Sequence, residues 1–301
     1  MLDLKQLTLS DKNVFDSYFR KYMPQISELT FTNLFAWRKH YKLKYAIIND
    51  YLCIFCADDN NKPYIFPPIG DLESDKLKDA FDVIQQYAKD NNHEVIIKKV
   101  YEHNVKQILD ILGPNYVAQY DRDNSDYVYL ASDLSTLKGN KYHKKRNHVN
   151  KFVLTYKYEY VPVNCDNKHL CYDVLDKWLS NKKTNLGSYN DEVDAIKQIV
   201  ENWDKLDCVG AIINVDDKPQ AFTFGERLNK DTAVIHIEKI NSEIDGLGEF
   251  INKEFCRQNF KDVMYINREQ DLGIEGLRKA KKSYLPQKFI NKYNIVNKRQ
   301  T

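Results

Sequence analysis

The sequence lacks any apolar run of the ~20 residues that a membrane span requires. Its first residues, 1–6, also lack the basic segment followed by an apolar core that marks a secretory signal. Neither sign of charge is in large excess, because 45 Lys and Arg nearly balance 43 Asp and Glu, for a net charge of +2. We therefore expect a cytoplasmic protein that binds any polyanion through a local basic cluster.

Clustered cysteines are missing as well. The six cysteines are scattered, and several lie in apolar segments, so we interpret them as reduced core residues. The one close pair, Cys53-x-x-Cys56, has no second pair at a zinc-ligand distance, and on a strand its side chains would point to opposite faces. We expect no metal site and no tightly bound cofactor.

The sequence does contain enough apolar residues to form the hydrophobic cores of two domains. The 301 residues are 43% apolar and 29% charged, a balance typical of globular proteins. Both half-chains show the same order of elements: a helix pair, an antiparallel hairpin, then helix, strand, helix and strand. Ala-Ile-Ile-Asn occurs at residues 46–49 and again at 211–214. The pattern predicts a duplicated α/β unit, with domains over 1–135 and 136–301.

The expected elements follow from hydrophobic periodicity and turn residues. Helices are predicted over residues 10–22, 30–40, 74–90, 105–112, 141–152, 167–180, 191–203, 247–258 and 274–284. Strands are predicted over residues 44–48, 52–55, 95–97, 116–120, 127–130, 209–215, 220–227, 232–240 and 263–266.

The most informative segment follows the last predicted strand. Asp271 stands where a helix N-cap is expected, and Glu275 falls in the first turn of the helix. Asn267, Arg268 and Glu269 are thereby placed at the carboxyl end of the strand, where open α/β sheets bind ligands. A capped surface helix with weak ion pairs is the alternative that spacing alone leaves open.

Three segments together resemble the family named after the C-terminal domain of phosphatidylglycerol lysyltransferase. Residues 267–284 match its closing pattern Asn-Arg-Glu-x-Asp-x-Gly-x-x-Gly-Leu-Arg-x-x-Lys-x-Ser-Tyr. Residues 137–152 are similar to its central Gly-x-x-Tyr-x-Lys-Lys-Arg-Asn-x-x-x-x-Phe helix, and residues 31–41 to its N-terminal helix. The resemblance spans nearly the whole chain.

The resemblance implies a fold and an activity. The fold would be α/β (α+β): tandem duplicated domains of the GCN5-related N-acetyltransferase (GNAT) type, with mixed sheets flanked by helices. The activity would be enzymatic transfer of an amino acid from aminoacyl-tRNA to an amine or hydroxyl acceptor, such as a lipid headgroup. The matched motif implies a cluster that orients donor ester and acceptor, made of Asn267, Arg268, Glu269, Asp271 and Arg278.

The predicted helix over 141–152 combines an apolar stripe with a basic face. The stripe consists of Tyr142, Val149, Phe152 and Val153. The phosphate contacts that we expect for tRNA come from Lys141, Lys144, Lys145, Arg146 and Lys151. A solvated basic surface is the alternative interpretation.

Two further side chains are candidates for proton relay. Strict alternation along the predicted strand 232–240 places His236 and Glu238 on one face. His236 is a candidate because its ordinary pKa lies near neutrality. A solvent-facing polar face, or a satisfied core pair, is the alternative for both.

Gly246 and Gly248 begin a predicted helix and resemble the pyrophosphate loop of acetyl-CoA-using GNAT enzymes. However, Glu243 stands where that loop has Arg or Gln, and Asp245 adds a second negative charge. The leading prediction is therefore an aminoacyltransferase that uses aminoacyl-tRNA. The alternatives are an acyl-CoA-dependent N-acyltransferase and a non-catalytic module that binds tRNA or a headgroup.

Overall fold

The computed structural model describes residues 2–181 and 189–300. The chain forms two compact units, one made of Met1–Asp126, Gln270–Glu275 and Phe289–Thr301, the other of Tyr127–Glu269 and Gly276–Lys288. This division differs from the predicted domains 1–135 and 136–301. The chain enters the second unit before residue 135, and later residues return to the first unit because they supply one of its strands.

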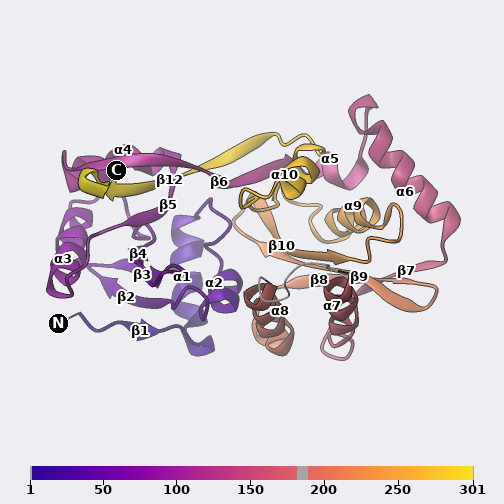
Figure 1. Ribbon diagram of the computed structural model, residues 1–301, viewed down its shortest axis with the longest axis horizontal. Coiled ribbons are helices and arrows are strands. Elements are labelled where there is room, and N and C mark those ends of the chain that lie inside the picture. Colours follow the sequence, from indigo (N-terminus) through magenta and orange to yellow (C-terminus); the bar gives the residue numbers. More distant parts are fainter. Residues whose placement is uncertain (1, 182–188, 301) are drawn as a thin grey trace. The chain divides into compact units, whose positions relative to one another are not determined.

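The first unit is a mixed sheet with helices (Figure 1). Its helices are η1 (Leu9–Asp11), α1 (Lys12–Tyr22), α2 (Phe31–Trp37), α3 (Lys76–Asp90), α4 (Glu102–Leu112) and η5 (Lys298–Gln300). Its strands are β1 (Lys5–Gln6), β2 (Lys44–Ile48), β3 (Tyr51–Ala57), β4 (Pro63–Ile65), β5 (Ile97–Tyr101), β12 (Lys288–Asn297) and the first part of β6 (Tyr116–Leu130). They are ordered β1-β2-β3-β4-β5-β12-β6, and β4 is parallel to β5.

Local chemistry explains several elements of the first unit. Asn49 and Asp50 have φ values of 49° and 71°, as a two-residue hairpin turn between β2 and β3 requires. The Thr30 side chain accepts a hydrogen bond from the Asn33 backbone and so caps α2. The apolar face of α3, with Leu77 and Phe81 fully buried, packs into the core.

The second unit repeats the mixed sheet. Its helices are α5 (Ala131–Thr136), η2 (Asn140–Tyr142), α6 (His143–Thr155), α7 (Leu170–Ser180), α8 (Asn190–Glu201), η4 (Trp203–Lys205), α9 (Leu247–Asn259) and α10 (Glu275–Lys282). Its strands are β7 (Tyr158–Pro162), β8 (Val209–Val215), β9 (Lys218–Arg227), β10 (Thr232–Ile240), β11 (Tyr265–Asn267) and the end of β6. They are ordered β6-β11-β10-β9-β8-β7, and β10 is parallel to β11.

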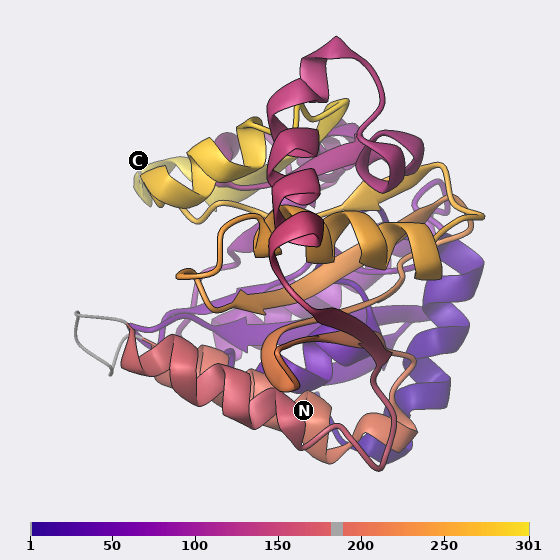
Figure 2. The same cartoon turned by 90° about the vertical axis from the view of Figure 1, so that its right-hand side faces the viewer.

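Helices cover both faces of the second sheet. Two views show α7 and α8 on one side of β8, β9 and β10, and α9 on the other (Figures 1 and 2). Side chains agree with this: Lys239 forms an ion pair with Glu192 of α8 at 2.7 Å, whereas its neighbour Glu238 accepts a hydrogen bond from Asn252 of α9. The predicted mixed α/β fold with flanking helices is confirmed.

Several element predictions need correction, and β4, β7 and α5 were not expected. The strands expected at 116–120 and 127–130 form one strand, β6, because its neighbour β12 supplies partners for the polar residues between them; Asn294 of β12 donates to Asp121 at 2.9 Å. The strand expected at 95–97 begins at Ile97 and runs to Tyr101. No element was expected after residue 284, yet β12 lies there.

None of the six cysteines, all of which lie within the described ranges, forms a disulfide. Five are buried, as interpreted from the sequence, but Cys165 is exposed.

Candidate functional site

The candidate site lies in the second unit, where a parallel strand pair ends. β10 and β11 pair in parallel only over Thr232–Val234 and Tyr265–Asn267. β11 then leaves the sheet, whereas β10 continues to Ile240. Side chains just beyond the pairing therefore lie beside an interruption in the sheet, the place where open α/β folds bind ligands.

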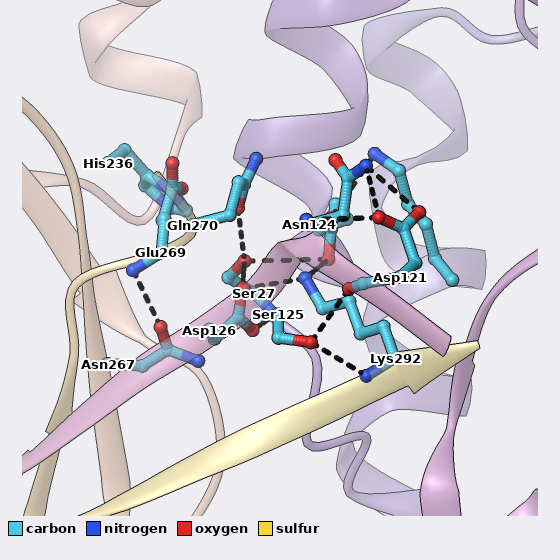
Figure 3. Close-up of polar contacts among 12 residues, drawn as sticks. Ser27, Asp121, Asn124, Ser125, Asp126, His236, Asn267, Glu269, Gln270 and Lys292 are labelled. Carbon is cyan, nitrogen blue, oxygen red and sulfur yellow. Dashed lines mark hydrogen bonds and ion pairs between the residues drawn. The ribbon is translucent and has the colours of Figure 1, made fainter. Parts of the chain in front are cut away.

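The backbone turn after β11 is built by the predicted motif. Asn267 is fully buried, and its Oδ1 accepts the Glu269 backbone N–H at 2.8 Å (Figure 3). This local bond accompanies a positive φ of 58° at Glu269, a conformation that few non-glycine residues adopt. The Arg268 backbone N–H donates to the Tyr127 carbonyl at 2.9 Å. The turn fixes where the Arg268 and Glu269 side chains begin.

Arg268 is the centre of a largely buried polar cluster, which we call the Arg268 cluster and define as Arg268, Glu238, Asn252 and Tyr284. The Arg268 side chain is 13% exposed, and its Nη2 lies 3.4 Å from Glu238 Oε1. Asn252, fully buried on α9, donates to Glu238 Oε2 at 3.4 Å. The guanidinium carbon lies 4.9 Å from the centre of the Tyr284 ring.

Two atoms of the Arg268 cluster are left unsatisfied. Within residues 2–181 and 189–300, neither Arg268 Nη1 nor Asn252 Oδ1 has a hydrogen-bond partner, although both atoms are buried. An unsatisfied buried polar atom costs about 1–3 kcal/mol, so two in one cluster indicate a place that a ligand completes.

Charge in the Arg268 cluster is fixed. Burial opposes the charge of Arg268, but Glu238 raises the pKa of the guanidinium above its ordinary value. Burial raises the pKa of the Tyr284 phenol, which therefore stays neutral. The cluster offers a permanent cation with a free donor, a carboxylate and an amide oxygen.

His236 lies between two carboxylates. Its Nδ1 is 2.7 Å from Glu269 Oε1, and both of these residues are labelled in Figure 3. Its Nε2 is 2.8 Å from Glu226 Oε1, and its side chain is 3% exposed. Burial alone would lower the pKa of His236, but the two carboxylates raise it to about 10. The ordinary pKa near neutrality, on which the relay prediction for His236 depended, does not hold.

The strict alternation assumed for β10 does not hold either. The register between β9 and β10 shifts between Ile235 and Ile237, so His236 is the extra residue of a β-bulge. His236 contacts Glu226 and Glu269, whereas Glu238 contacts Arg268 and Asn252. The two relay candidates thus belong to separate sets of contacts.

The remaining motif residues take different positions. Asp271 belongs to the first unit, where it is fully buried and its Oδ2 lies 3.3 Å from Arg122 Nη1. Its Oδ1 accepts the Gly273 N–H at 2.9 Å, while α10 begins only at Glu275, so Asp271 closes a turn and is not the expected N-cap. Arg278 lies half-buried on α10 in the second unit.

Sequence reasoning missed other residues that build the site. Lys281 is buried and donates to the carbonyl of Arg268, and Tyr129 donates to the carbonyl of Lys281 at 2.8 Å. Asn252 was missed as well. The feature of the sequence that could have indicated Asn252 is the position of a polar residue directly after Phe250 and Ile251, on the buried face of α9.

The predicted basic helix 141–152 is observed as α6, which begins at His143, while Lys141 lies before it in η2. Most of the predicted cations already have intramolecular contacts. Lys141 pairs with Asp133 at 2.7 Å, Lys145 with Glu249 at 3.0 Å and Lys151 with Asp245 at 2.7 Å. Arg146 donates to the carbonyls of Leu137 and Gly139. Lys144 is exposed.

The predicted apolar stripe, which begins at Tyr142 in η2 and continues along α6, is confirmed in three positions and wrong in one. Tyr142, Val149 and Phe152 are buried, whereas Val153 is 40% exposed. Only part of the predicted stripe is therefore buried in the core.

Gly246 and Gly248 begin α9 as predicted, and close packing explains the first of them. Gly246 has a φ of +80°, and a Cβ there would lie 2.3 Å from the His148 carbonyl oxygen of α6. A Cβ on Gly248 would lie 3.1 Å from Ile240. The approach of α6 to the start of α9 therefore accounts for Gly246 without a bound pyrophosphate.

A mixed sheet whose central strands run in parallel and then part, present once in each unit, defines an acyltransferase-type fold of the tandem GNAT class. The structure is similar to a solved tandem GNAT protein from the clavulanic acid biosynthesis pathway, with a TM-score of 0.54 and 8% identity over 98% of this chain and 97% of that chain.

The chain belongs to the family described as phosphatidylglycerol lysyltransferase, C-terminal, whose model matches residues 19–296. A conserved protein of unknown function from Bacteroides thetaiotaomicron is 35% identical over 99% of this chain and 100% of that chain, with a TM-score of 0.92. L-PGS from Bacillus licheniformis is similar with a TM-score of 0.66 and 14% identity over 97% of this chain and 93% of that chain. A search of curated proteins gave no match.

The C-terminal domain of a putative lysylphosphatidylglycerol synthetase from Agrobacterium fabrum is also similar. Its TM-score is 0.68 at 13% identity, over 97% of this chain and 93% of that chain. In the part of the chain that the structure describes, no helix has the length and apolar character to cross a bilayer.

Proposed function

We propose that the protein transfers an aminoacyl group from aminoacyl-tRNA to an amine or hydroxyl acceptor, either a lipid headgroup or a small molecule. Membership of the phosphatidylglycerol lysyltransferase family and the acyltransferase-type fold support this reaction class. The observation that carries the proposal is the Arg268 cluster, where a buried guanidinium nitrogen and a buried amide oxygen have no hydrogen-bond partner within the described part of the chain.

Each group of the cluster has a task in such a transfer. The acceptor nitrogen or oxygen attacks the ester carbonyl carbon of the aminoacyl group, and the carbonyl oxygen gains negative charge. Arg268 Nη1 donates to that oxygen, an interaction that strengthens as the charge develops. Asn252 Oδ1 accepts from the α-ammonium group of the amino acid.

Proton movement completes the balance. Glu238 takes the proton that the attacking amine or hydroxyl loses, directly or through a water. The bond between the carbonyl carbon and the 3′ oxygen of the tRNA then breaks, and that oxygen takes the proton from Glu238, which returns to its starting state. His236 stays protonated between Glu226 and Glu269, so we assign it a positioning role for the turn that carries Arg268.

The predicted tRNA contacts stay on α6 and on Lys141 in η2, the turn before it. Lys144 is exposed, and the lysine side chains of the pairs Lys141–Asp133 and Lys151–Asp245 are 50% and 66% exposed. Exposed ion pairs contribute little, so phosphates can replace those carboxylates at small cost. From the other motif residues, we assign Asn267 and Asp271 to turn geometry and Arg278 to the donor end of the tRNA.

Coenzyme A is disfavoured as the donor. The loop that would hold its pyrophosphate has α6 packed against Gly246, and Asp245 places negative charge beside it. The aminoacyl-tRNA proposal therefore has priority over the acyl-CoA alternative.

The first test is binding of aminoacylated and deacylated bulk tRNA at two salt concentrations, with coenzyme A as competitor. We expect preference for the aminoacylated pool and insensitivity to coenzyme A, and sequencing of the retained tRNA identifies the amino acid. Equal binding of both pools would indicate a non-catalytic module. Displacement by coenzyme A would favour the N-acyltransferase alternative.

A further inference from the structure

The two units share a detail of their sheets. In the first unit, β4 and β5 pair in parallel at Ile65 and Ile97; in the second, the last parallel pair joins Val234 and Asn267. Two residues beyond each pairing, β5 has Lys99 with a φ of 62° and the chain after β11 has Glu269 with a φ of 58°. The first unit thus repeats the backbone geometry that builds the candidate site.

A cavity of about 220 Å³ lies at this place in the first unit. Its apolar lining is provided mainly by Met23, Ile26, Leu29, Pro67, Pro68 and Ile69. The segment after β4 is held to β3 by reciprocal backbone bonds of 3.0 Å between Leu52 and Ile69. The cavity therefore has walls that secondary structure fixes on one side.

One charged side chain lines the cavity. Lys99 is 6% exposed, and its Nζ lies 3.2 Å from Glu28 Oε1. An ammonium group has three N–H donors, and this contact with Glu28 uses at most one of them. Two ring faces also lie near the ammonium, that of Tyr41 at 4.8 Å and that of Phe66 at 5.5 Å. Lys99 therefore keeps N–H donors for a ligand.

The charges behind Lys99 cancel. Glu28 Oε2 and Asp126 Oδ1 each lie 2.6 Å from Lys292 Nζ (the Asp126 and Lys292 side chains are labelled in Figure 3). Burial opposes ionisation of Glu28, but Lys292 and Lys99 lower its pKa to about 2. Two cations face two carboxylates, so a ligand anion would add uncompensated charge to a buried place.

We propose that this cavity is a second ligand site, which takes a small, mainly apolar molecule whose uncharged carbonyl oxygen accepts a hydrogen bond from Lys99. The apolar walls bind the body of the molecule, and the ammonium satisfies its one polar atom. The proposal does not depend on the transfer reaction assigned to the second unit.

Methyl-labelled NMR of the full chain tests the proposal with three probes of one chain length: hexanamide, hexanoate and hexylamine. We expect hexanamide to shift the methyl resonances of Met23, Ile26 and Ile69, with at least about threefold larger changes than the two charged probes at equal concentration. Larger changes with hexanoate would mean an anion site, and larger changes with hexylamine would mean that Glu28 dominates. Either result would overturn the proposal.

A filling variant locates the binding. Leu72 lines the same cavity and is half-buried, so Leu72→Trp reduces the space and should abolish the hexanamide shifts. Leu154→Trp is the matched control, because Leu154 is 87% exposed on α6. Shifts that survive Leu72→Trp, or no shifts with any probe on the wild-type chain, would refute the site.

Discussion

Single side chains decide what the end of β11 can bind. Arg268 combines a fixed charge, a carboxylate partner and a buried nitrogen without a hydrogen bond among the described residues. The Tyr284 ring, 4.9 Å from the guanidinium carbon, limits its movement. The property to test is therefore the presence of two terminal guanidinium nitrogens on Arg268, and not its positive charge alone.

Arg268→Lys keeps the positive charge but loses the planar pair of nitrogens. The side chain can then no longer donate hydrogen bonds to both Glu238 and the ester carbonyl oxygen. We expect transfer to fall by roughly 100-fold or more, with a change in Tm of only a few degrees. Arg257→Lys is the control, because Arg257 is 53% exposed on the same side of α9 as its partner Glu254. A large fall in Tm together with the loss of activity in Arg268→Lys would mean that the motif is structural.

His236 makes stability depend on pH. Its pKa is about 10 in the folded chain against 6.5 ordinarily, so its contribution is complete below pH 6.5 and disappears as pH rises towards 10. A difference of one in pKa between the folded and the unfolded chain corresponds to ~1.4 kcal/mol, so the contribution amounts to several kcal/mol at most. Urea unfolding of wild type and His236→Gln should give curves that converge between pH 6.5 and 10. A difference that stays constant over this window would contradict the assigned charge.

At the scale of elements, α6 approaches the start of α9 most tightly at Gly246. Gly246→Ala places a Cβ against the His148 carbonyl in a conformation that alanine disfavours, so we expect a loss of more than about 1 kcal/mol. Gly276→Ala in α10 is the matched control, because its Cβ would meet no atom of the described chain within 4 Å. Helix propensity should make that change neutral or stabilising by up to about 1 kcal/mol. Thermal unfolding of both variants distinguishes them.

The surface of α6 should act in tRNA binding through charge. Lys144→Ala should reduce the slope of log K against log salt by about 1, as expected for one lost phosphate contact. Lys230→Ala removes the same charge from the exposed connection between β9 and β10 and should leave the slope unchanged. Identical slopes in both variants would show that α6 does not contact the tRNA.

Element prediction succeeded where burial follows periodicity and failed where a polar side chain is buried. β10 was placed at residues 232–240 because its alternation is strong, although the bulge at His236 could not be foreseen from that alternation. β12 was missed because fully buried Lys292 interrupts its apolar pattern. The Arg268 motif could be recognised from its residues, whereas Asn252 became part of the site only through folding.

At the scale of the molecule, the first unit depends on a strand that comes from the far end of the sequence. Lys292→Met would leave Glu28 and Asp126 buried beside one another, with an expected cost of roughly 3–5 kcal/mol. Hydrogen exchange should then accelerate in β5 and the first part of β6, while β8, β9 and β10 keep their protection. Lys282→Met, at an exposed position of α10, is the control. Uniform acceleration in both units would show that they unfold together.

The return of residues 289–301 to the first unit also has a consequence for synthesis on the ribosome. β5 is made early, but β12, its antiparallel neighbour, is translated only after the whole span Tyr127–Glu269. At about 5–20 residues per second, this delay lasts on the order of ten seconds or more. During that time the nascent chain carries an unfinished sheet edge, so the usual order, in which the N-terminal unit is completed first, does not apply.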